Sequence, residues 1–344
     1  MTALERRTAT SHASPLAPSG SAEEITHETV MRRRAERPRH GWRKALYSAT
    51  GGRYNPGISE SEADRNALLR RIRRQLPGAH RIAVTSIKGG VGKTTVTACL
   101  GLTLADHRGD RVVALDANPD AGTLADRLTG ETHITVRQMI EKIDDIDSLT
   151  AMSRYTSLAG RLQVLASDQD PAMSEAFNRD EYANVCSVLS RFCNILLTDS
   201  GTGLVHSAME GTLALADTLV VVGAPTVDGA SRASKTLDWL AAHGHQRHVD
   251  NAVVVLSHDR ASPEVDGEAV HEHFAQRCRA VHSIPLDQHL SAGGRIDLDA
   301  LREPTRRAFL EVAASIADDF GEPLTRRPAD RAQARSSADV SAGR

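Results

Sequence analysis

Short runs of β-branched and aliphatic residues recur along this chain, and longer segments with apolar residues at helical spacing lie between most of them. Such runs predict buried strands, and the longer segments predict helices that cover them. The runs lie at residues 82–87, 111–116, 162–165, 194–199, 218–223 and 251–256. Strands that alternate with helices predict an α/β fold, a doubly wound and mostly parallel sheet with helices on both faces.

The helix predicted before the first strand opens with Ser59 and Glu62, which fit a capping box, and ends before Pro77. Its apolar residues favour packing on the domain, whereas the arginines of its other face favour solvent, or a contact with anionic lipid or DNA. These arginines are Arg70, Arg71, Arg73 and Arg74. Further helices are predicted at residues 94–107, 135–146, 181–192, 229–243 and 303–320.

The first predicted strand ends in a glycine-rich turn, KGGVGKTT, at residues 88–95. Because its three glycines lack a Cβ, the backbone N–H groups can curl around an anion and approach phosphate oxygens closely. Lys93 can neutralise the β- and γ-phosphates of a nucleotide, and the Thr94 hydroxyl can hold Mg²⁺. The helix that follows points the positive end of its dipole at the same place. The turn therefore predicts a nucleotide-phosphate site.

Carboxylates end two of the predicted strands. Asp116 and Asp199 each close an apolar run, and the carboxyl ends of strands in such a sheet face the ligand crevice. Asp199 lies downstream of the phosphate turn, as a Walker B aspartate does, and can accept a hydrogen bond from Mg²⁺-bound water. The polar residues after these strands are therefore candidates for the same site.

The turn resembles the deviant Walker A motif of the MinD/ParA family of ATPases, in which a second lysine opens the loop, and the resemblance covers about residues 80–320. It implies ATP and Mg²⁺ as cofactors and a homodimer formed around ATP, with Lys88 reaching the partner's nucleotide. Catalytic roles are implied for Lys88, Asp116 and Asn118. Nucleotide binding is implied for Lys88, Gly89, Gly90, Val91, Gly92, Lys93, Thr94, Thr95 and Pro285. Residues 281–285 together with Asp287 resemble the loop of the family that lines the adenine pocket. Metal binding is implied for Thr94, Asp116 and Asp199.

The chain departs from the family pattern in two places. The family usually carries D-x-D after the second strand, and the second aspartate orients the attacking water, but here Asn118 stands at that position. An amide brings no negative charge to a water, so we expect ATP binding with slow hydrolysis unless Asp120 substitutes. Ser257 and His258 stand where the family commonly has an asparagine that reads adenine, so selectivity for the base is left open.

Charge is distributed unevenly along the chain. Residues 1–80 hold 15 Lys and Arg against 8 Asp and Glu, whereas the remainder holds 27 against 36. The basic cluster around Trp42 predicts a solvated charge run, or a contact with an acidic protein, a membrane or nucleic acid. The composition predicts a disordered basic tail over residues 1–40, a basic linker and leading helix over 41–79, the ATPase domain over 80–320 and a disordered tail over 321–344.

The cysteines and the hydropathy of the chain indicate the cellular compartment of the protein. The four cysteines lie far apart without a CxxC pair, which predicts reduced core residues. No apolar run is long enough for a signal peptide or a membrane span. The sequence therefore predicts a cytoplasmic protein, which its basic N-terminus could also hold at the inner face of the cell membrane.

Four segments, GWRKAL, LDANPD, DSGTG and PTVDGA, are similar to the MinD-like ATPases of actinobacterial type VII (ESX) secretion loci. The resemblance implies an ATP-switched dimer that positions or regulates a secretion, cell-pole or division assembly, together with a protein activator. One alternative is a nucleotide-binding scaffold with negligible hydrolysis that acts through its basic N-terminal segment, and Asn118 favours it. A DNA-partitioning ParA is a further alternative, which the net acidity of residues 81–344 disfavours. A ligase or synthase on the same fold is also compatible with the motifs.

Overall fold

The computed structural model describes residues 36–39, 41–86, 89–118, 122–130, 134–168, 177–201, 207–257 and 265–321. The chain forms two compact units, residues 1–63 and residues 64–344. Most of the two predicted tails lies outside the described residues.

The N-terminal unit contains the helix α2 (Gly41–Ala49) and the start of α3 (Glu60–Ile72). None of the residues of α2 is buried, and Trp42 is 67% exposed. Arg43 holds the unit together, because its guanidinium donates to the carbonyl of Pro56 at 2.9 Å and lies 5.3 Å from the Trp42 ring centroid. The described part of this unit therefore has hydrogen bonds but little apolar core.

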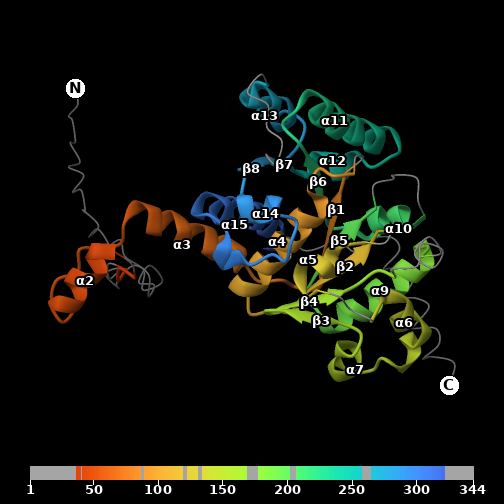
Figure 1. Cartoon of the computed structure of the whole chain (residues 1–344), viewed down its shortest axis with the longest axis horizontal. Coiled ribbons are helices and arrows are strands. Elements are labelled where there is room, and N and C mark those ends of the chain that lie inside the picture. Colours follow the sequence, from red (N-terminus) through yellow and green to blue (C-terminus); the bar gives the residue numbers. More distant parts are fainter. Residues whose placement is uncertain are drawn as a thin grey trace, which may run out of the picture. The chain divides into compact units, whose positions relative to one another are not determined.

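The larger unit contains an eight-stranded sheet with the strand order β3-β4-β2-β5-β1-β6-β7-β8 (Figure 1). Its strands are β1 (His80–Thr85), β2 (Val112–Ala117), β3 (Ser157–Ala159), β4 (Leu162–Leu165), β5 (Ile195–Ser200), β6 (Thr218–Gly223), β7 (Val253–Ser257) and β8 (Ala280–Ile284). All pairs are parallel except β3 with β4. This confirms the predicted mostly parallel sheet and places each of its six predicted strands within about two residues, whereas β3 and β8 were not predicted as strands.

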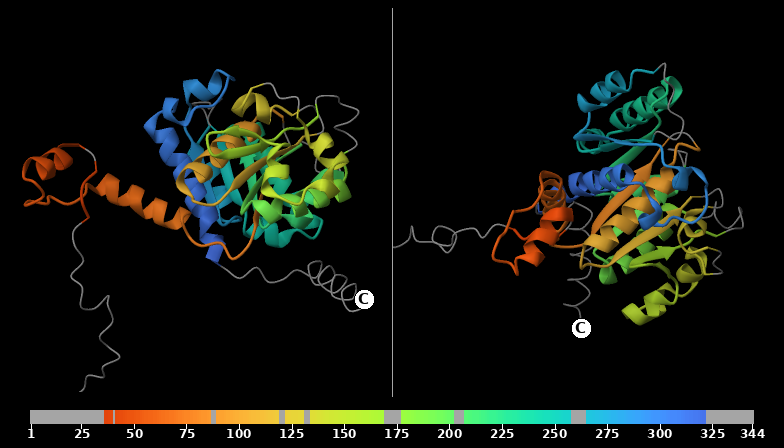
Figure 2. Two further views of the ribbon diagram at one scale, coloured as in Figure 1. Left: turned by 90° about the horizontal axis from the view of Figure 1, so that it is seen from below. Right: turned by 60° about the vertical axis from the view of Figure 1, so that its left-hand side comes forward.

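The strands at the centre of the sheet are apolar on both faces because both faces are covered. Every residue of β2, β5 and β6 is buried. Parallel strands are linked by crossovers that place helices on both sides, so their sequences read as continuous apolar runs rather than as alternating ones. Figure 2 shows helices on the two sides of the sheet.

On one face, α4 (Lys93–His107), α5 (Leu124–Leu128) and α15 (Glu303–Ala317) contribute to one hydrophobic core, and leucines of α3 pack against it. The opposite face is covered in two parts. One part is α6 (Val136–Glu141), α7 (Leu149–Ser153) and α9 (Arg179–Phe192). The other part is α10 (Ser207–Leu215), α11 (Val227–Ala242), α12 (Gln246–Asp250) and α13 (Gly267–Ala275). The predicted packing of α3 on the domain is thereby confirmed.

Arginines at the end of α3 and directly after it also form ion pairs and hydrogen bonds within this unit. Arg71 and Arg74 both pair with Asp318, at 2.7 and 3.2 Å, and Arg73 donates to the carbonyl of His107 at 3.0 Å. These arginines close the end of α15, which continues into the 3-10 turn η5 (Asp318–Gly321). These three arginines therefore stabilise the fold of the larger unit.

Two predicted helices differ in detail. The predicted helix over residues 135–146 is broken, because Lys142 leaves the helical conformation (φ −124°) between α6 and the 3-10 turn η2 (Ile143–Asp145). The helix α9 begins at Arg179, earlier than predicted, because the Asn178 side chain accepts hydrogen bonds from the backbone of Asp180 and Glu181. Pattern-based boundaries are least reliable at such caps.

The remaining expectations about the core hold. All four cysteines are free and buried, and burial raises the pKa of each thiol, so none is poised as a thiolate. Within the described ranges, none of the helices is long and apolar enough to cross a bilayer. The described part of this unit also contains three short elements, α14 (Gln288–Ser291), η4 (Leu298–Ala300) and η5.

Candidate functional site

The glycine-rich turn joins the end of the central strand β1 to the start of α4. Gly90 and Gly92 have φ values of 76° and 89°, in the left-handed region that favours glycine. No side chain caps the first turn of α4, so its N–H groups remain available to an anion. A Cβ on Gly90 would meet open space. The predicted residues Gly89 to Thr95 thus form one loop and helix start, whereas Lys88 lies outside the described residues.

The Asp199 carboxylate, at the end of β5, gathers three side chains of this helix start. It accepts a hydrogen bond from the Lys93 ammonium at 2.7 Å and from the Thr94 hydroxyl at 2.6 Å. Thr97 donates to the same carboxylate at 3.2 Å. Asp199 is fully buried and Lys93 is 6% exposed. The sequence predicted Lys93, Thr94 and Asp199 at one site, but it predicted neither the contact of Thr97 nor the pairing of Asp199 with Lys93.

Asp116 lies beside Asp199 because β2 and β5 are neighbours and the two residues pair in the register. It is 1% exposed, and it accepts hydrogen bonds from the backbone N–H groups of Leu124 at 3.0 Å and Asn118 at 3.1 Å. Burial, and secondly the charge of Asp199, raise the pKa of the Asp116 carboxyl. A Cβ on Gly122 would overlap the Asp116 carboxylate, so only glycine lets the following segment pass so close.

The donor set fits a hard divalent cation. Among the described residues, two buried carboxylates lie near a single lysine, which pairs with Asp199, and the pKa of Asp116 is raised first by burial and then by the charge of Asp199. Within the described ranges there is no cluster of three or more His, Cys, Asp or Glu side chains that would hold a metal unaided. Magnesium in phosphate sites usually takes one or two protein oxygens, with waters and phosphates filling the rest. Thr94, Asp116 and Asp199 can supply such oxygens.

We call residues 89–95, Asp116 and Asp199 the phosphate site. Asn118 follows it at the carboxyl end of β2 and is partly exposed. The alternative carboxylate that the sequence offered, Asp120, lies outside the described residues, as do Thr202 and Gly203 of the DSGTG segment. The described residues therefore place an amide at the edge of the phosphate site.

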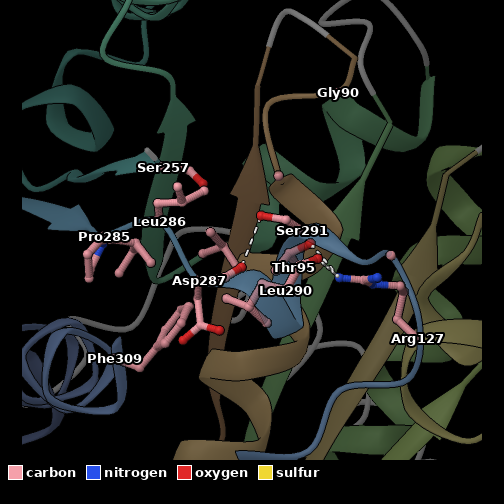
Figure 3. A pocket seen from close by; sticks show the side chains of 14 residues that line it. Gly90, Thr95, Arg127, Ser257, Pro285, Leu286, Asp287, Leu290, Ser291 and Phe309 are labelled. Carbon is pink, nitrogen blue, oxygen red and sulfur yellow. Dashed lines mark hydrogen bonds between the residues drawn. The ribbon is translucent and has the colours of Figure 1, made fainter. Parts of the chain in front are cut away.

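A pocket of about 260 Å³ adjoins the loop, and we call it the side pocket (Figure 3). Pro285 lines it, at the place where the sequence predicted a nucleotide contact, together with Ser257 from the end of β7. A Cβ on Gly92 would come within 3.2 Å of the Ser257 hydroxyl, so this wall of the pocket lies directly against the loop. His258 lies outside the described residues.

Two further residues line the side pocket: Asp287, which the sequence resemblance placed near the base of the nucleotide, and Arg127, which the sequence did not single out. Asp287 is 3% exposed and accepts hydrogen bonds from the backbone of His289 and Arg302, at 3.0 and 2.9 Å. Burial alone would raise the pKa of its carboxyl, but these donated bonds outweigh it and hold the pKa below its usual value. Arg127, from α5, donates to the Thr95 hydroxyl at 3.3 Å and to the Leu290 carbonyl at 3.1 Å. Arg127 does not stand in a motif that spacing alone would reveal.

A central parallel strand that feeds a glycine-rich anion loop, with a lysine and a buried strand-end aspartate behind it, defines a P-loop nucleotide-binding protein. Residues 82–296 match the CobQ/CobB/MinD/ParA nucleotide binding domain, and the chain belongs to this family. The recognition of a MinD/ParA-like protein from the loop sequence is therefore confirmed.

One curated relative is the ESX-1 secretion-associated protein EspI of Mycobacterium tuberculosis H37Rv, with 37% identity over 284 residues. The match covers 81% of this chain but only 42% of that relative's length. Among solved structures, the ParA family ATPase of Chlorobium tepidum superposes with a TM-score of 0.60 at 17% identity, over 69% of this chain and 98% of that one. The septum site-determining protein MinD of Pyrococcus horikoshii, complexed with Mg-ADP, gives 0.56 at 20% identity, over 71% and 98%. These neighbours confirm the fold.

Proposed function

We propose that this chain binds ATP with Mg²⁺, forms a homodimer around the nucleotide and hydrolyses it slowly, and that this cycle controls a larger assembly. The observation that supports the proposal most is the contact of Asp199 with both Lys93 and Thr94 beneath the glycine-rich loop. A lysine and a hydroxyl held at the end of the same strand are placed for phosphate and for a cation, respectively. Family membership and the Mg-ADP complex of the P. horikoshii neighbour support the same ligands.

The roles of the residues follow from their positions. Lys93, which contacts Asp199, would bind phosphate oxygens, while Thr94, Asp199 and Asp116 would hold the cation. Mg²⁺, when bound, supplies positive charge that stabilises the charge developing on the transferred phosphoryl group. Asn118 offers an amide that can orient a water by hydrogen bonding but cannot take its proton. Slow turnover without a partner follows from this last step.

The cross-subunit role of Lys88 is the part of the proposal that makes the protein a switch. Its test is light scattering of the purified chain with Mg²⁺-ATP, together with a calorimetric ATP affinity. We expect Lys88→Ala to bind ATP but to remain monomeric, because its contact is with the partner's phosphates. The exposed Lys142 offers a matched control, and Lys142→Ala should dimerise normally. An ATP-dependent dimer of the Lys88 variant would contradict the cross-subunit role.

A second candidate function is a nucleotide-binding scaffold with negligible hydrolysis, and the amide at Asn118 is the observation that favours it. Phosphate release in the same samples separates the two candidates. Dimers that form with ATP and persist without phosphate release would support the scaffold. Turnover that accompanies the loss of dimers would support the switch.

The assembly it controls is proposed from two observations. The relative EspI is described as ESX-1 secretion-associated, which suggests a secretion assembly. The N-terminal unit displays exposed Trp42 and Tyr54, and Arg43 and Lys44 directly follow Trp42 in the chain. Exposed aromatics with arginine are typical of contact surfaces for other macromolecules, so this unit is the proposed docking segment for a protein activator, or for a membrane surface. A DNA role is less favoured, because Arg71, Arg73 and Arg74 are engaged within the larger unit.

A further inference from the structure

We propose that Arg127 is a nucleotide ligand of this chain, and that its guanidinium binds the α-phosphate of the nucleotide in the phosphate site. The inference rests on the proposed ATP binding and adds a residue to it that no motif assigns. Arg127 belongs to the short helix α5, which follows the segment after β2. It is thus a contribution from outside the glycine-rich loop.

Arg127 is buried but lines the side pocket. It is 9% exposed, and Figure 3 shows its side chain reaching toward Thr95 and Leu290, on the side away from Pro285 and Ser257 in this view. Thr95 is the last residue of the KGGVGKTT turn and lies in the first turn of α4. The guanidinium of Arg127 therefore contacts the hydroxyl of a residue in the first turn of α4, whose N–H groups face the phosphate site.

The charge of Arg127 is not balanced by a carboxylate within the described ranges. Its side-chain hydrogen bonds go to two neutral oxygens, the Thr95 hydroxyl and the Leu290 carbonyl. Burial lowers the pKa of Arg127, because the cation loses solvent without gaining an ion-pair partner there. A buried cation of this kind gains from an anion that enters the pocket, and arginine binds phosphate through two parallel hydrogen bonds.

The same residue also ties two segments together. Its side chain holds Leu290, and its own carbonyl accepts a hydrogen bond from the Ile296 N–H at 2.8 Å. A purely structural role would therefore keep residues 290–296 against α5 without any contact to a ligand. The two roles predict different responses to changes in the nucleotide.

The test measures dissociation constants for ATP and for the two diastereomers of ATPαS, in which sulfur replaces one α-phosphate oxygen, by calorimetry on the full chain. We expect Arg127→Gln to bind ATP roughly 10- to 100-fold more weakly, because a hydrogen-bonded charge pair is lost. The wild type should discriminate between the diastereomers, and the variant should lose most of that discrimination. Arg127→Lys keeps the charge without the planar fork, so it should lose less affinity and change the diastereomer ratio.

Arg137→Gln is the matched control, because Arg137 is also largely buried but pairs with Glu181 between α6 and α9. It should leave all three affinities unchanged. An Arg127→Gln variant that weakens ATP and both diastereomers equally, with the wild-type ratio kept, would assign a structural role only and overturn the inference. Wild-type ATP affinity in both Arg127 variants would also overturn it. If the wild type itself binds no ATP, then the proposed function fails, and the inference fails with it.

Discussion

In the phosphate site, one carboxylate contacts Lys93 and Thr94 within 2.7 Å, and the groups come from a single loop and two neighbouring strand ends. In the side pocket, Ser257, Pro285 and Arg127 come from three separate elements, and the hydrogen bonds there are mostly to backbone groups. The first region is a compact arrangement of charges with an excess negative charge. The second region is a pocket wall formed by separate segments that hydrogen-bond to one another.

The contrast between the phosphate site and the side pocket shows which part of a nucleotide site this fold can supply by itself. Any parallel sheet of this kind brings the ends of β1, β2 and β5 together, so a phosphate site needs only the right residues there. The side pocket needs specific contacts between segments that are distant along the chain, such as Arg127 with Leu290. Variation among relatives is therefore easier in the side pocket than in the phosphate site.

The largest expected effect comes from Lys93→Ala, which tests whether the phosphate site carries most of the binding. We expect ATP affinity to fall about 100-fold or more, because a charged hydrogen bond to phosphate is lost in a buried setting. Stability should also fall, by about 3–5 kcal/mol, because the buried Asp199 loses its partner. Calorimetry with ATP and urea unfolding measure the two effects.

The exposed Lys235 provides the control for this variant. Lys235→Ala removes a lysine of the same size from α11, and it should change neither ATP affinity nor, beyond about 0.5 kcal/mol, the free energy of unfolding. Unchanged ATP affinity in Lys93→Ala would place the phosphates somewhere other than the glycine-rich loop.

The comparison also explains how far the sequence could predict the structure. The strands and the loop were predictable, because buried parallel strands are continuous apolar runs and the loop glycines serve an anion cradle. Asp116 and Asp199 were predictable as strand ends. The contact between Lys93 and Asp199 was not predictable, because spacing along the chain does not show to which oxygen a lysine donates its hydrogen bond.

The side pocket was predictable only at Pro285 and at the end of β7. Arg127 lies in a five-residue helix without a periodic pattern, and its partners are 32 and 163 residues away. Asp287 was noted near the last strand, but its burial depends on backbone donors of Arg302 and His289 that no sequence pattern marks. Long-range backbone contacts of this kind require the folded chain.

Asn118→Asp tests whether the phosphate site is built for binding or for catalysis. An aspartate there restores D-x-D and should raise the rate of phosphate release at least about 10-fold, because help from a general base is worth roughly 10²- to 10⁴-fold. ATP affinity should change little, since Asn118 follows the phosphate site rather than facing Lys93. A phosphate-release assay with Mg²⁺-ATP measures the rate.

Asn251→Asp, at the exposed end of α12, makes the same chemical change away from the site and should leave the rate unaltered. If Asn118→Asp releases phosphate no faster than the wild type, then the attacking water is not oriented from this position. Asp120 would then be the next residue to examine.

The smallest expected effect is that of Asp287→Asn, which perturbs the side pocket and leaves the phosphate site intact. The carboxylate accepts backbone bonds from His289 and Arg302, so the neutral amide should lower the free energy of unfolding at pH 7 by about 1–3 kcal/mol. ATP affinity should fall only a few-fold, because Lys93 and Thr94 keep their places. Urea unfolding at several pH values and calorimetry measure both.

The pH dependence decides whether the charge of Asp287 is the cause. Its pKa is lowered in the folded protein, so its stabilising contribution is present above the unfolded pKa, about 3.9, and is lost as the pH falls through the lower folded value. The gap in unfolding free energy between wild type and Asp287→Asn should therefore be constant from pH 7 to about pH 5 and shrink below about pH 4. The exposed Asp297, which also accepts a backbone bond at a helical turn, is the matched control, and Asp297→Asn should open a smaller gap. A gap for Asp287→Asn that persists unchanged to pH 3 would mean that the shape of the side chain, and not its charge, holds this wall of the side pocket.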